Sequence, residues 1–335
     1  MLIRCPRCSE QLEGTARFCG VCGTTLPAPE VGRVIASRYA LYERIGAGSL
    51  GIVYRAEQLG TGRKVAIKML PPDTKRDPYI VERFRREGDL LCKLRSPHTV
   101  TTYEADREPD GSLYIVMELS TGKSLAEVIR HDGALDWVRV LRILAGICDS
   151  LAEAHALGVV HRDLKPENIL LESRAAQRDF VKVLDFGLAK LLNAQVHLSP
   201  AGVTIGAIEY ASPEQLLQRP IDARSDLYSL GVLAYLLVTG RHPLHEARTY
   251  GDLVAAHIQT SPPPPSKLKP ELPGDFDTIL ARLLDKDPDR RFPDATALAA
   301  VIGVALSTLA PGGDTIQEPS LGEEATELGE PPKRP

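Results

Sequence analysis

One segment of ten residues limits the folds open to this chain of 335 residues more than any other. It reads His161-Arg162-Asp163-Leu164-Lys165-Pro166-Glu167-Asn168-Ile169-Leu170, and it brings acidic, cationic and side-chain amide groups into one stretch. Asp185, which opens an Asp-Phe-Gly triplet, follows Asn168 by 17 residues. Asparagine and aspartate offer the hard oxygen ligands that Mg²⁺ prefers. The chain is therefore expected to bring this segment and Asp185 to one site.

A glycine-rich stretch lies far upstream of that segment. Residues 39–45 alternate as a strand and lead into Gly46, Gly48 and Gly51, with the spacing Gly-x-Gly-x-x-Gly. A dinucleotide-binding site would need a helix after these glycines, whereas residues 52–56 continue as a strand. The pattern therefore favours a glycine hairpin folded over nucleotide phosphates, where missing side chains let backbone amides approach.

Three further elements follow the hairpin. Residues 65–68, Val-Ala-Ile-Lys, form a strand that ends in a lysine, and residues 113–118 form a buried strand that runs into a polar turn. Between them, a helix is predicted from Pro78 to Leu91, with Glu87 on the same face as the apolar residues. Glu87 is therefore the acid of this helix that is placed among buried groups.

This ordered set resembles the eukaryotic-type, or Hanks-type, bacterial serine/threonine protein kinases. Their catalytic core is a His-Arg-Asp-Leu-x-x-x-Asn loop followed by Asp-Phe-Gly. The resemblance covers about residues 39–305 and implies an α+β, two-lobed protein-kinase fold. A small β-rich N-lobe would span residues 39–118 and a larger helical C-lobe residues 121–305.

The resemblance also implies the catalytic roles. Asp163 would orient the acceptor hydroxyl, and Lys165 would reach the γ-phosphate of ATP. Lys68 would grip the α- and β-phosphates while paired with Glu87. Asn168 and Asp185 would hold Mg²⁺, or Mn²⁺ in its place.

ATP would lie between the lobes. Met117 would be the gatekeeper behind the adenine, and the Glu118 carbonyl and Ser120 amide would hydrogen-bond the base. The residues expected to contact the nucleotide are Ile45, Gly46, Gly48, Gly51, Val53, Ala66, Lys68, Met117, Glu118, Ser120, Leu170 and Asp185.

The segment between Asp185 and Glu214 matches an activation segment, which ends in Ser-Pro-Glu. Lys165 is typical of the branch that phosphorylates Ser and Thr of protein substrates. Arg162 with Lys190 could clamp a phosphorylated Ser199 or Thr204 through charge-assisted bonds. Such autophosphorylation in trans would use a kinase homodimer. The alternative is an unmodified loop held by packing.

Ala207 departs from the family pattern, because many of these kinases carry a threonine there that bonds the catalytic Asp and Lys. Its loss predicts looser geometry at Asp163 and Lys165, with reduced activity or altered substrate choice. A second hypothesis is a pseudokinase scaffold that recruits partners, and a third is a small-molecule kinase. The intact catalytic set argues against the second, and the full activation segment argues against the third.

Two helper residues are also implied. Asp226 would bond the backbone of the catalytic loop, and Arg291 would pair with Glu214. A run of prolines at residues 262–265 is expected to be an ordinary loop between helices, or alternatively an adaptor site.

Residues 1–26 contain two Cys-x-x-Cys pairs, formed by Cys5 and Cys8 and by Cys19 and Cys22. Four thiolates at this spacing predict a closed tetrahedral zinc ribbon, whose metal would supply the folding free energy of so short a segment. Two disulfides or a redox pair are the alternatives. The ribbon would bind a protein partner or cap the kinase, and residues 27–38 are expected to be a linker.

Charge and hydropathy bound the setting. Six acids and two bases in residues 311–335 account for the whole net charge of −4, so nothing indicates a nucleic-acid surface. That tail is expected to be disordered. No apolar leader precedes Cys5, and the apolar run at residues 295–310 falls short of the roughly 20 residues that span a bilayer. A closing helix is expected there, a membrane-associated segment being the alternative, and the cytoplasm is the expected location, without a membrane anchor.

Overall fold

The structure is a computed structural model that describes residues 2–4, 7–13, 19–22, 30–48, 51–71, 74, 77–174, 177–186 and 208–308. Predictions that concern Cys5, Lys190, Ser199, Thr204, Ala207 and the tail of residues 311–335 lie outside these residues and stay predictions.

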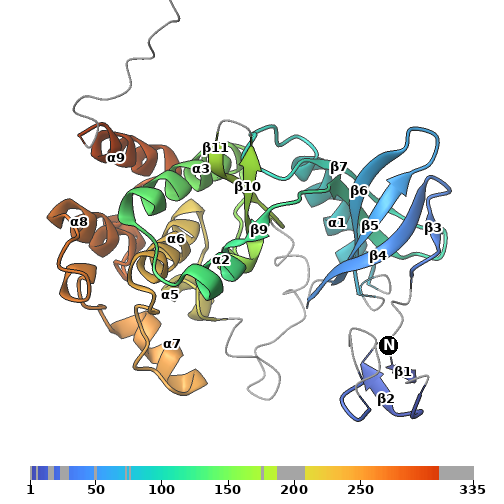
Figure 1. The fold of residues 1–335 in the computed structure, drawn as a ribbon, viewed down its shortest axis with the longest axis horizontal. Coiled ribbons are helices and arrows are strands. Elements are labelled where there is room, and N and C mark those ends of the chain that lie inside the picture. The colour runs from blue at the N-terminus through green and yellow to red at the C-terminus, as the bar shows by residue number, and fades with distance from the viewer. Residues whose placement is uncertain are drawn as a thin grey trace, which may run out of the picture.

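A six-stranded antiparallel sheet forms the first lobe (Figure 1). Its strand order is β3-β4-β5-β6-β8-β7. The strands are β3 (Val34–Ile35), β4 (Tyr39–Gly48), β5 (Gly51–Gln58), β6 (Arg63–Met69), β7 (Thr102–Arg107) and β8 (Leu113–Glu118). The predicted helix is α1 (Pro78–Leu91), which begins with Asp77 accepting a hydrogen bond from the Tyr79 amide and packs against β7. The β-rich N-lobe expected from the sequence is confirmed.

This sheet begins earlier in the chain than expected. Ile35 is fully buried, although it falls in the segment of residues 27–38 that was predicted to be a linker. The Ala36 amide donates to a Glu108 carboxylate oxygen at 2.5 Å, and Arg33 pairs with Asp110 at 3.1 Å. Residues 33–38 therefore belong to the lobe, and the linker prediction is wrong for them. A two-residue strand is too short to show a period in the sequence.

Helices form most of the second lobe. The α-helices are α2 (Leu125–Asp132), α3 (Trp137–Ala156), α5 (Pro213–Leu216), α6 (Ala223–Thr239), α7 (Tyr250–Gln259), α8 (Gly274–Leu283) and α9 (Ala295–Thr308). Short 3-10 turns are η2 (Pro166–Asn168), η4 (Pro265–Lys267) and η5 (Pro288–Arg290). In α6 nearly every side chain is buried, so this helix is the centre of the lobe.

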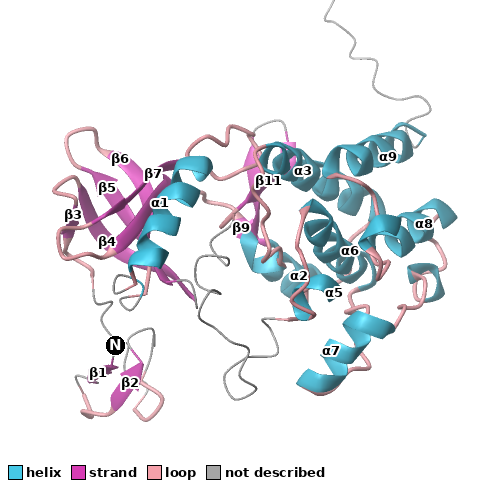
Figure 2. Cartoon of the chain, turned by 180° about the vertical axis from the view of Figure 1, so that it is seen from behind, coloured by secondary structure: helices cyan, strands magenta, loops and turns pink. Residues whose placement is uncertain are grey.

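A small sheet lies where the lobes meet, as Figure 2 shows from behind. Its order is β11-β10-β9, from β9 (Lys123–Ser124), β10 (Ile169–Arg174) and β11 (Gln177–Val183). Because β10 begins with the last two residues of the ten-residue segment and β11 ends just before Asp185, this hairpin brings the two sequence motifs together.

The apolar run near the C-terminus forms α9, which packs on α3. Ala295, Leu298 and Ile302 are buried, whereas Val304 is 65% exposed. Among the described residues, no helix has the length and apolar character needed to cross a bilayer. The proline run connects α7 to α8, as expected, and includes the start of η4.

The N-terminal segment contributes a separate antiparallel pair, β1 (Leu2–Arg4) with β2 (Gln11–Glu13). Cys8 lies in the turn between β1 and β2, and Cys19 and Cys22 lie after β2.

Candidate active site

The ten-residue segment forms a loop between α3 and β10, and a single buried carboxylate holds it. Asp226, on α6, accepts the backbone N–H groups of His161 and Arg162, both at 2.8 Å. His155 bonds the same carboxylate at 2.8 Å. Arg162 has a φ of +67°, a conformation that side chains disfavour, and these bonds stabilise it. The predicted role of Asp226 is confirmed.

Asp163 lies at the centre of a short polar network. Lys165 donates to its Oδ2 at 2.8 Å, and the Asn168 amide nitrogen donates to its carbonyl at 2.7 Å and to Oδ2 at 3.2 Å. Lys165 and Asp163 are each about one-quarter exposed at the side chain. An accessible carboxylate with a cation beside it can orient an incoming hydroxyl and balance negative charge on a nearby group.

Asp185 is joined to this loop through the backbone. The Leu184 amide donates to the Asn168 carbonyl at 2.9 Å, and His161 Nε2 donates to the Leu184 carbonyl at 2.7 Å. His161 Nδ1 accepts from the Asp163 amide at 3.3 Å, so Nε2 is the nitrogen that carries the proton. These bonds place the backbones of Asn168 and Asp185 close together. Asn168 turns its amide nitrogen toward Asp163, so its side-chain oxygen takes no part in those bonds, and such an oxygen is a ligand of the kind that divalent cations prefer.

Lys68 has a different partner from the one expected. Its ammonium, only 4% exposed, donates to Asp185 Oδ2 at 2.8 Å, across 117 residues of sequence. Glu87 instead accepts from Arg83 at 3.2 Å and lines a small cavity together with Arg162. No ion pair joins Lys68 to Glu87 in the part of the chain that the structure describes. Among the described residues, Asp185 thus takes the place beside Lys68 that the family resemblance gave to Glu87.

The predicted glycine hairpin is formed by β4 and β5. Gly46 pairs with Val53, and Gly48 pairs with Gly51, so the glycines lie at its tip. Gly51 has a φ of +126°, and a Cβ there would lie 2.1 Å from the Met69 carbonyl oxygen. Glycine at position 51 is therefore required by the approach of β6, whatever the hairpin binds.

The other residues expected at the nucleotide lie around the junction of the lobes. Ala66 and Met117 face each other in the pairing of β6 with β8, and Leu170 lies on β10. Glu118 ends β8, and the Ser120 hydroxyl donates to Glu172 at 2.6 Å. Met117 and Asp185 line one apolar cavity between α1, β8 and β11. Ile45 and Val53 are partly exposed on β4 and β5.

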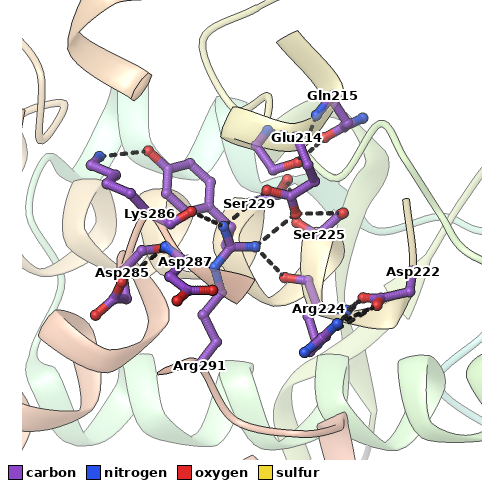
Figure 3. Close-up of polar contacts among 12 residues, drawn as sticks. Glu214, Gln215, Asp222, Arg224, Ser225, Ser229, Asp285, Lys286, Asp287 and Arg291 are labelled. Atoms are coloured by element: carbon purple, nitrogen blue, oxygen red, sulfur yellow. Dashed lines mark hydrogen bonds and ion pairs between the residues drawn. The ribbon is translucent and has the colours of Figure 1, made fainter. Parts of the chain in front are cut away.

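Arg291 and Glu214 form the buried pair that the sequence predicted (Figure 3). The two side chains meet in a fork, with Nη1–Oε1 at 2.7 Å and Nη2–Oε2 at 2.9 Å, and the Arg291 side chain is fully buried. Ser225 also donates to Glu214, at 2.6 Å. Burial alone would raise the pKa of Glu214, but hydrogen bonds from Arg291 and Ser225 hold it below its ordinary value. The expected pair thus joins the start of α5 to the residue that directly follows η5.

Three polar residues of this region were missed in the sequence. They are His155, which bonds Asp226; Gln215, whose amide donates to the Arg162 carbonyl at 2.8 Å; and Lys182, which bonds Glu118 at 2.7 Å. Lys182 carried a signal, because it is a cation inside the apolar run of residues 180–183.

Three of the four N-terminal cysteines gather in one place. The Sγ atoms of Cys8, Cys19 and Cys22 all lie within 4.8 Å of one another, with Cys8 and Cys19 3.4 Å apart. At a zinc–sulfur distance of about 2.3 Å, the sulfurs of a tetrahedral site lie roughly 3.8 Å apart. The donor set therefore fits zinc, and Cys5, the expected fourth ligand, lies outside the described residues.

Comparisons with known proteins agree with this geometry. A family model described as "Protein kinase domain" matches residues 39–301. The chain is 38% identical over 275 residues to a Myxococcus xanthus protein named serine/threonine-protein kinase pkn3, covering 81% of this chain and 50% of the relative. It is 37% identical over 303 residues to Pkn1 of the same organism, covering 90% and 41%. The chain thus spans about half the length, or less, of these curated relatives.

A solved structure is also similar. The crystal structure of the Mycobacterium tuberculosis PknI kinase domain matches with a TM-score of 0.65 and 25% identity, covering 83% of this chain and 98% of that one. The two-lobed arrangement in Figures 1 and 2 is therefore one that a crystal structure also shows.

Proposed function

The chain belongs to the protein kinase family, and from that premise we propose that it is a serine/threonine protein kinase. It transfers the γ-phosphoryl group of ATP to Ser or Thr hydroxyls of protein substrates. The observation that carries this proposal is the single network in which Asp163 meets Lys165 and Asn168 while Asp185 meets Lys68. Relatives whose names state the same activity support it.

The Asp163 carboxylate accepts a hydrogen bond from the substrate hydroxyl and so orients the hydroxyl oxygen toward the phosphorus atom. Lys165, 2.8 Å from Asp163, balances the charge that develops on the transferred group. Positioning and charge neutralisation supply most of the rate in this chemistry. The buried Asp226 acts through the loop backbone and keeps Asp163 in place.

A kinase domain implies ATP and Mg²⁺ or Mn²⁺. Asn168 and Asp185 are the residues that would hold the cation, which when bound neutralises phosphate oxygens. Lys68 would then bind the α- and β-phosphates of the nucleotide. The hairpin glycines at positions 46, 48 and 51, with Ile45, Val53, Ala66 and Leu170, would enclose the nucleotide, and Met117, Glu118 and Ser120 would hold its base.

Residues 1–26 would be a zinc ribbon that binds a partner and takes no part in the chemistry. Three clustered thiols support this proposal, together with the fit of their spacing to one tetrahedral ion. A homodimer for trans-autophosphorylation at Ser199 or Thr204 remains part of the same proposal.

The activity is tested by replacing the residue that orients the hydroxyl. We expect Asp163→Asn to lower phosphate incorporation, into the chain itself and into a basic protein, by about a hundredfold to ten-thousandfold. Labelled ATP with Mg²⁺ and mass spectrometry of the phosphosites give the measurement. Asp275→Asn is the matched control, because this aspartate is exposed on α8 and is not part of the catalytic loop.

If wild-type protein incorporates no more phosphate than Asp163→Asn, the kinase proposal is wrong. Binding of ADP without transfer would instead favour the pseudokinase scaffold. Phosphorylation that appears on serine and threonine, and disappears with Asp163→Asn, supports the proposal as stated.

A further inference from the structure

A buried lysine outside the catalytic set reaches the segment that joins the two lobes. Lys182 lies on β11, and its side chain is only 5% exposed. Its ammonium donates to Glu118 Oε2 at 2.7 Å and to the Thr99 carbonyl at 3.3 Å. A buried cation is costly unless it is paired and hydrogen-bonded, so the position of Lys182 depends on these two acceptors.

Glu118 is held on two sides. Its amide donates to the Thr101 carbonyl at 2.9 Å, and the Thr101 amide donates back to Glu118 Oε2 at 3.2 Å. The oxygen that receives Lys182 is therefore the one that also receives the Thr101 amide. The last residue of β8 is fixed in both backbone and side chain.

The segment of residues 98–101 is itself joined to β11. The Val100 amide donates to the Val183 carbonyl at 2.9 Å, and the Val183 amide donates to the His98 carbonyl at 2.7 Å. Thr99 also bonds Ser150 of α3 at 2.6 Å. Lys182 therefore sits at a junction of three segments: the end of β8, residues 98–101, and β11.

The same junction adjoins the two parts of the proposed nucleotide site, the one that would bind the base and the one that would hold the metal. Lys182 pairs directly with Leu170, which would lie under the base, and directly opposed residues of a strand pair share one face. Three residues after Lys182, Asp185 would hold the metal. Glu118 would present its backbone carbonyl to the adenine.

We propose that the Lys182–Glu118 ion pair positions the segment that binds the adenine and so sets the affinity and base preference of the site. Lys182 is a positioning residue, because it acts through Glu118 and touches no reacting atom. This inference rests on the proposed function, since the Glu118 carbonyl and Ser120 amide are the groups that bind the base there.

The base preference follows from hydrogen-bond chemistry. A carbonyl acceptor next to an amide donor matches the amino group and ring nitrogen of adenine, whereas guanine presents the opposite order of donor and acceptor. A site built on such bonds rejects the mismatched base only while its groups stay in place. Loosening the junction should therefore weaken adenine binding more than guanine binding.

The test uses Lys182→Met, Glu118→Gln and the double variant, all in the full chain. We expect KM for ATP to rise about tenfold in each single variant with kcat within about threefold, because contacts to the base are equally strong in ground and transition states. Calorimetric Kd values for ADP should rise by the same factor, and those for GDP should rise less. The double variant should match the single ones, since both changes break the same ion pair, one by removing the cation and the other by removing the negative charge.

The control is Lys64→Met, which removes an exposed ion pair with Glu57 in the six-stranded sheet that also contains Glu118. It should leave every nucleotide constant within about twofold, since exposed pairs contribute little. Melting temperatures are measured for all variants, because a purely structural pair would lower Tm without changing the ratio of GDP to ADP affinity. If Lys182→Met does not fold, Glu118→Gln carries the test by itself.

ADP affinity within about twofold of wild type in both single variants would overturn the inference, as would equal losses for ADP and GDP. A double variant weakened about a hundredfold would also overturn it, because independent effects multiply. These failures would appear in variants of an active wild-type protein. Wild-type protein that binds ADP but transfers no phosphate would reject the proposed activity alone, and one that binds no ADP would reject both.

Discussion

Asp226 and His257 are fully buried titratable groups of the helical lobe, and burial affects them in different ways. Asp226 is fully buried; burial alone would raise its pKa, but hydrogen bonds from His155 and from the Arg162 amide hold that pKa below its ordinary value. The carboxylate therefore stays ionised and keeps its two bonds to the catalytic loop. A neutral residue of the same shape would form weaker hydrogen bonds with the two loop amides, because bonds to a charged acceptor are stronger.

His257 gives a prediction at this scale. It is fully buried on α7, and its Nδ1 lies 3.0 Å from the Tyr228 hydroxyl. Burial, with the nearby charges of His242 and Lys286, lowers the pKa of His257 from 6.5 to about 3. The unfolded chain therefore takes up a proton below pH 6.5 that the folded chain refuses, so His257 destabilises the fold as pH falls from 6.5 toward 3.

We expect His257→Gln to make the free energy of unfolding less sensitive to acid. The difference in slope from wild type should reach at most about 1.4 kcal/mol per pH unit below pH 6.5. Urea denaturation between about pH 5 and pH 8 measures it. His131→Gln, at a side chain that is 88% exposed, is the control and should keep the wild-type slope. Identical slopes for wild type and His257→Gln would refute the prediction.

At the scale of the elements, glycine marks the places where a helix lies against its neighbour. A Cβ at Gly231 of α6 would lie 2.7 Å from the Leu283 Cβ of α8, and one at Gly88 of α1 would lie 2.6 Å from the Ala105 Cβ of β7. Helical periodicity predicted α1, but it could not show these contacts. A glycine inside a helix weakens it in isolation, so here the close packing must offset that cost.

Gly231→Ala should destabilise the protein in spite of its better helix propensity. The added methyl would force apart α6 and α8 where Leu283 is fully buried, and such overpacking costs about 1–3 kcal/mol. Gly303→Ala is the matched control, because no atom lies within 4 Å of a Cβ at that position of α9. It should stabilise the protein by up to about 1 kcal/mol. Chemical denaturation decides, and two changes of the same sign would contradict the packing argument.

At the scale of the whole molecule, the cysteine cluster and the kinase domain are proposed to be separate in function. A zinc site closed by four thiolates holds structure and leaves no open position for chemistry. The catalytic network draws on residues 68–226 and uses no cysteine. Metal loss should therefore affect the N-terminal segment alone.

Cys19→Ser should remove about one zinc ion per chain and leave the rate of phosphate transfer within about twofold of wild type. Zinc is measured by elemental analysis of the purified protein, and the rate with a basic protein substrate. Cys92→Ser, outside the cluster, should keep the metal. Wild-type protein without zinc would reject the ribbon, and a large loss of rate in Cys19→Ser would show that the two parts are coupled.

Much of the fold and the site could be predicted because their signals are local. The strand and helix periods of residues 39–91 predicted β4 to β6 and α1, and the spacing of Asp163, Asn168 and Asp185 predicted that they share one site, but not the β10–β11 hairpin that joins them. The strand β3 could not be predicted, because its two residues are too few to show an alternation of buried and exposed side chains. The partner of Lys68 could not be predicted either, because Glu87 and Asp185 are both acids of suitable spacing and only packing decides between them.

The sequence by itself determined which chemical groups this protein has and the order in which they occur, since motif spacing and periodicity depend on neighbours along the chain. The tertiary structure alone decided which groups meet across long separations. Lys68 with Asp185 is one such meeting, and Lys182 with Glu118, 64 residues apart, is another. The physical reason is that a buried charge is stabilised by whichever opposite charge the packed fold brings within hydrogen-bond distance, and no local pattern records that choice.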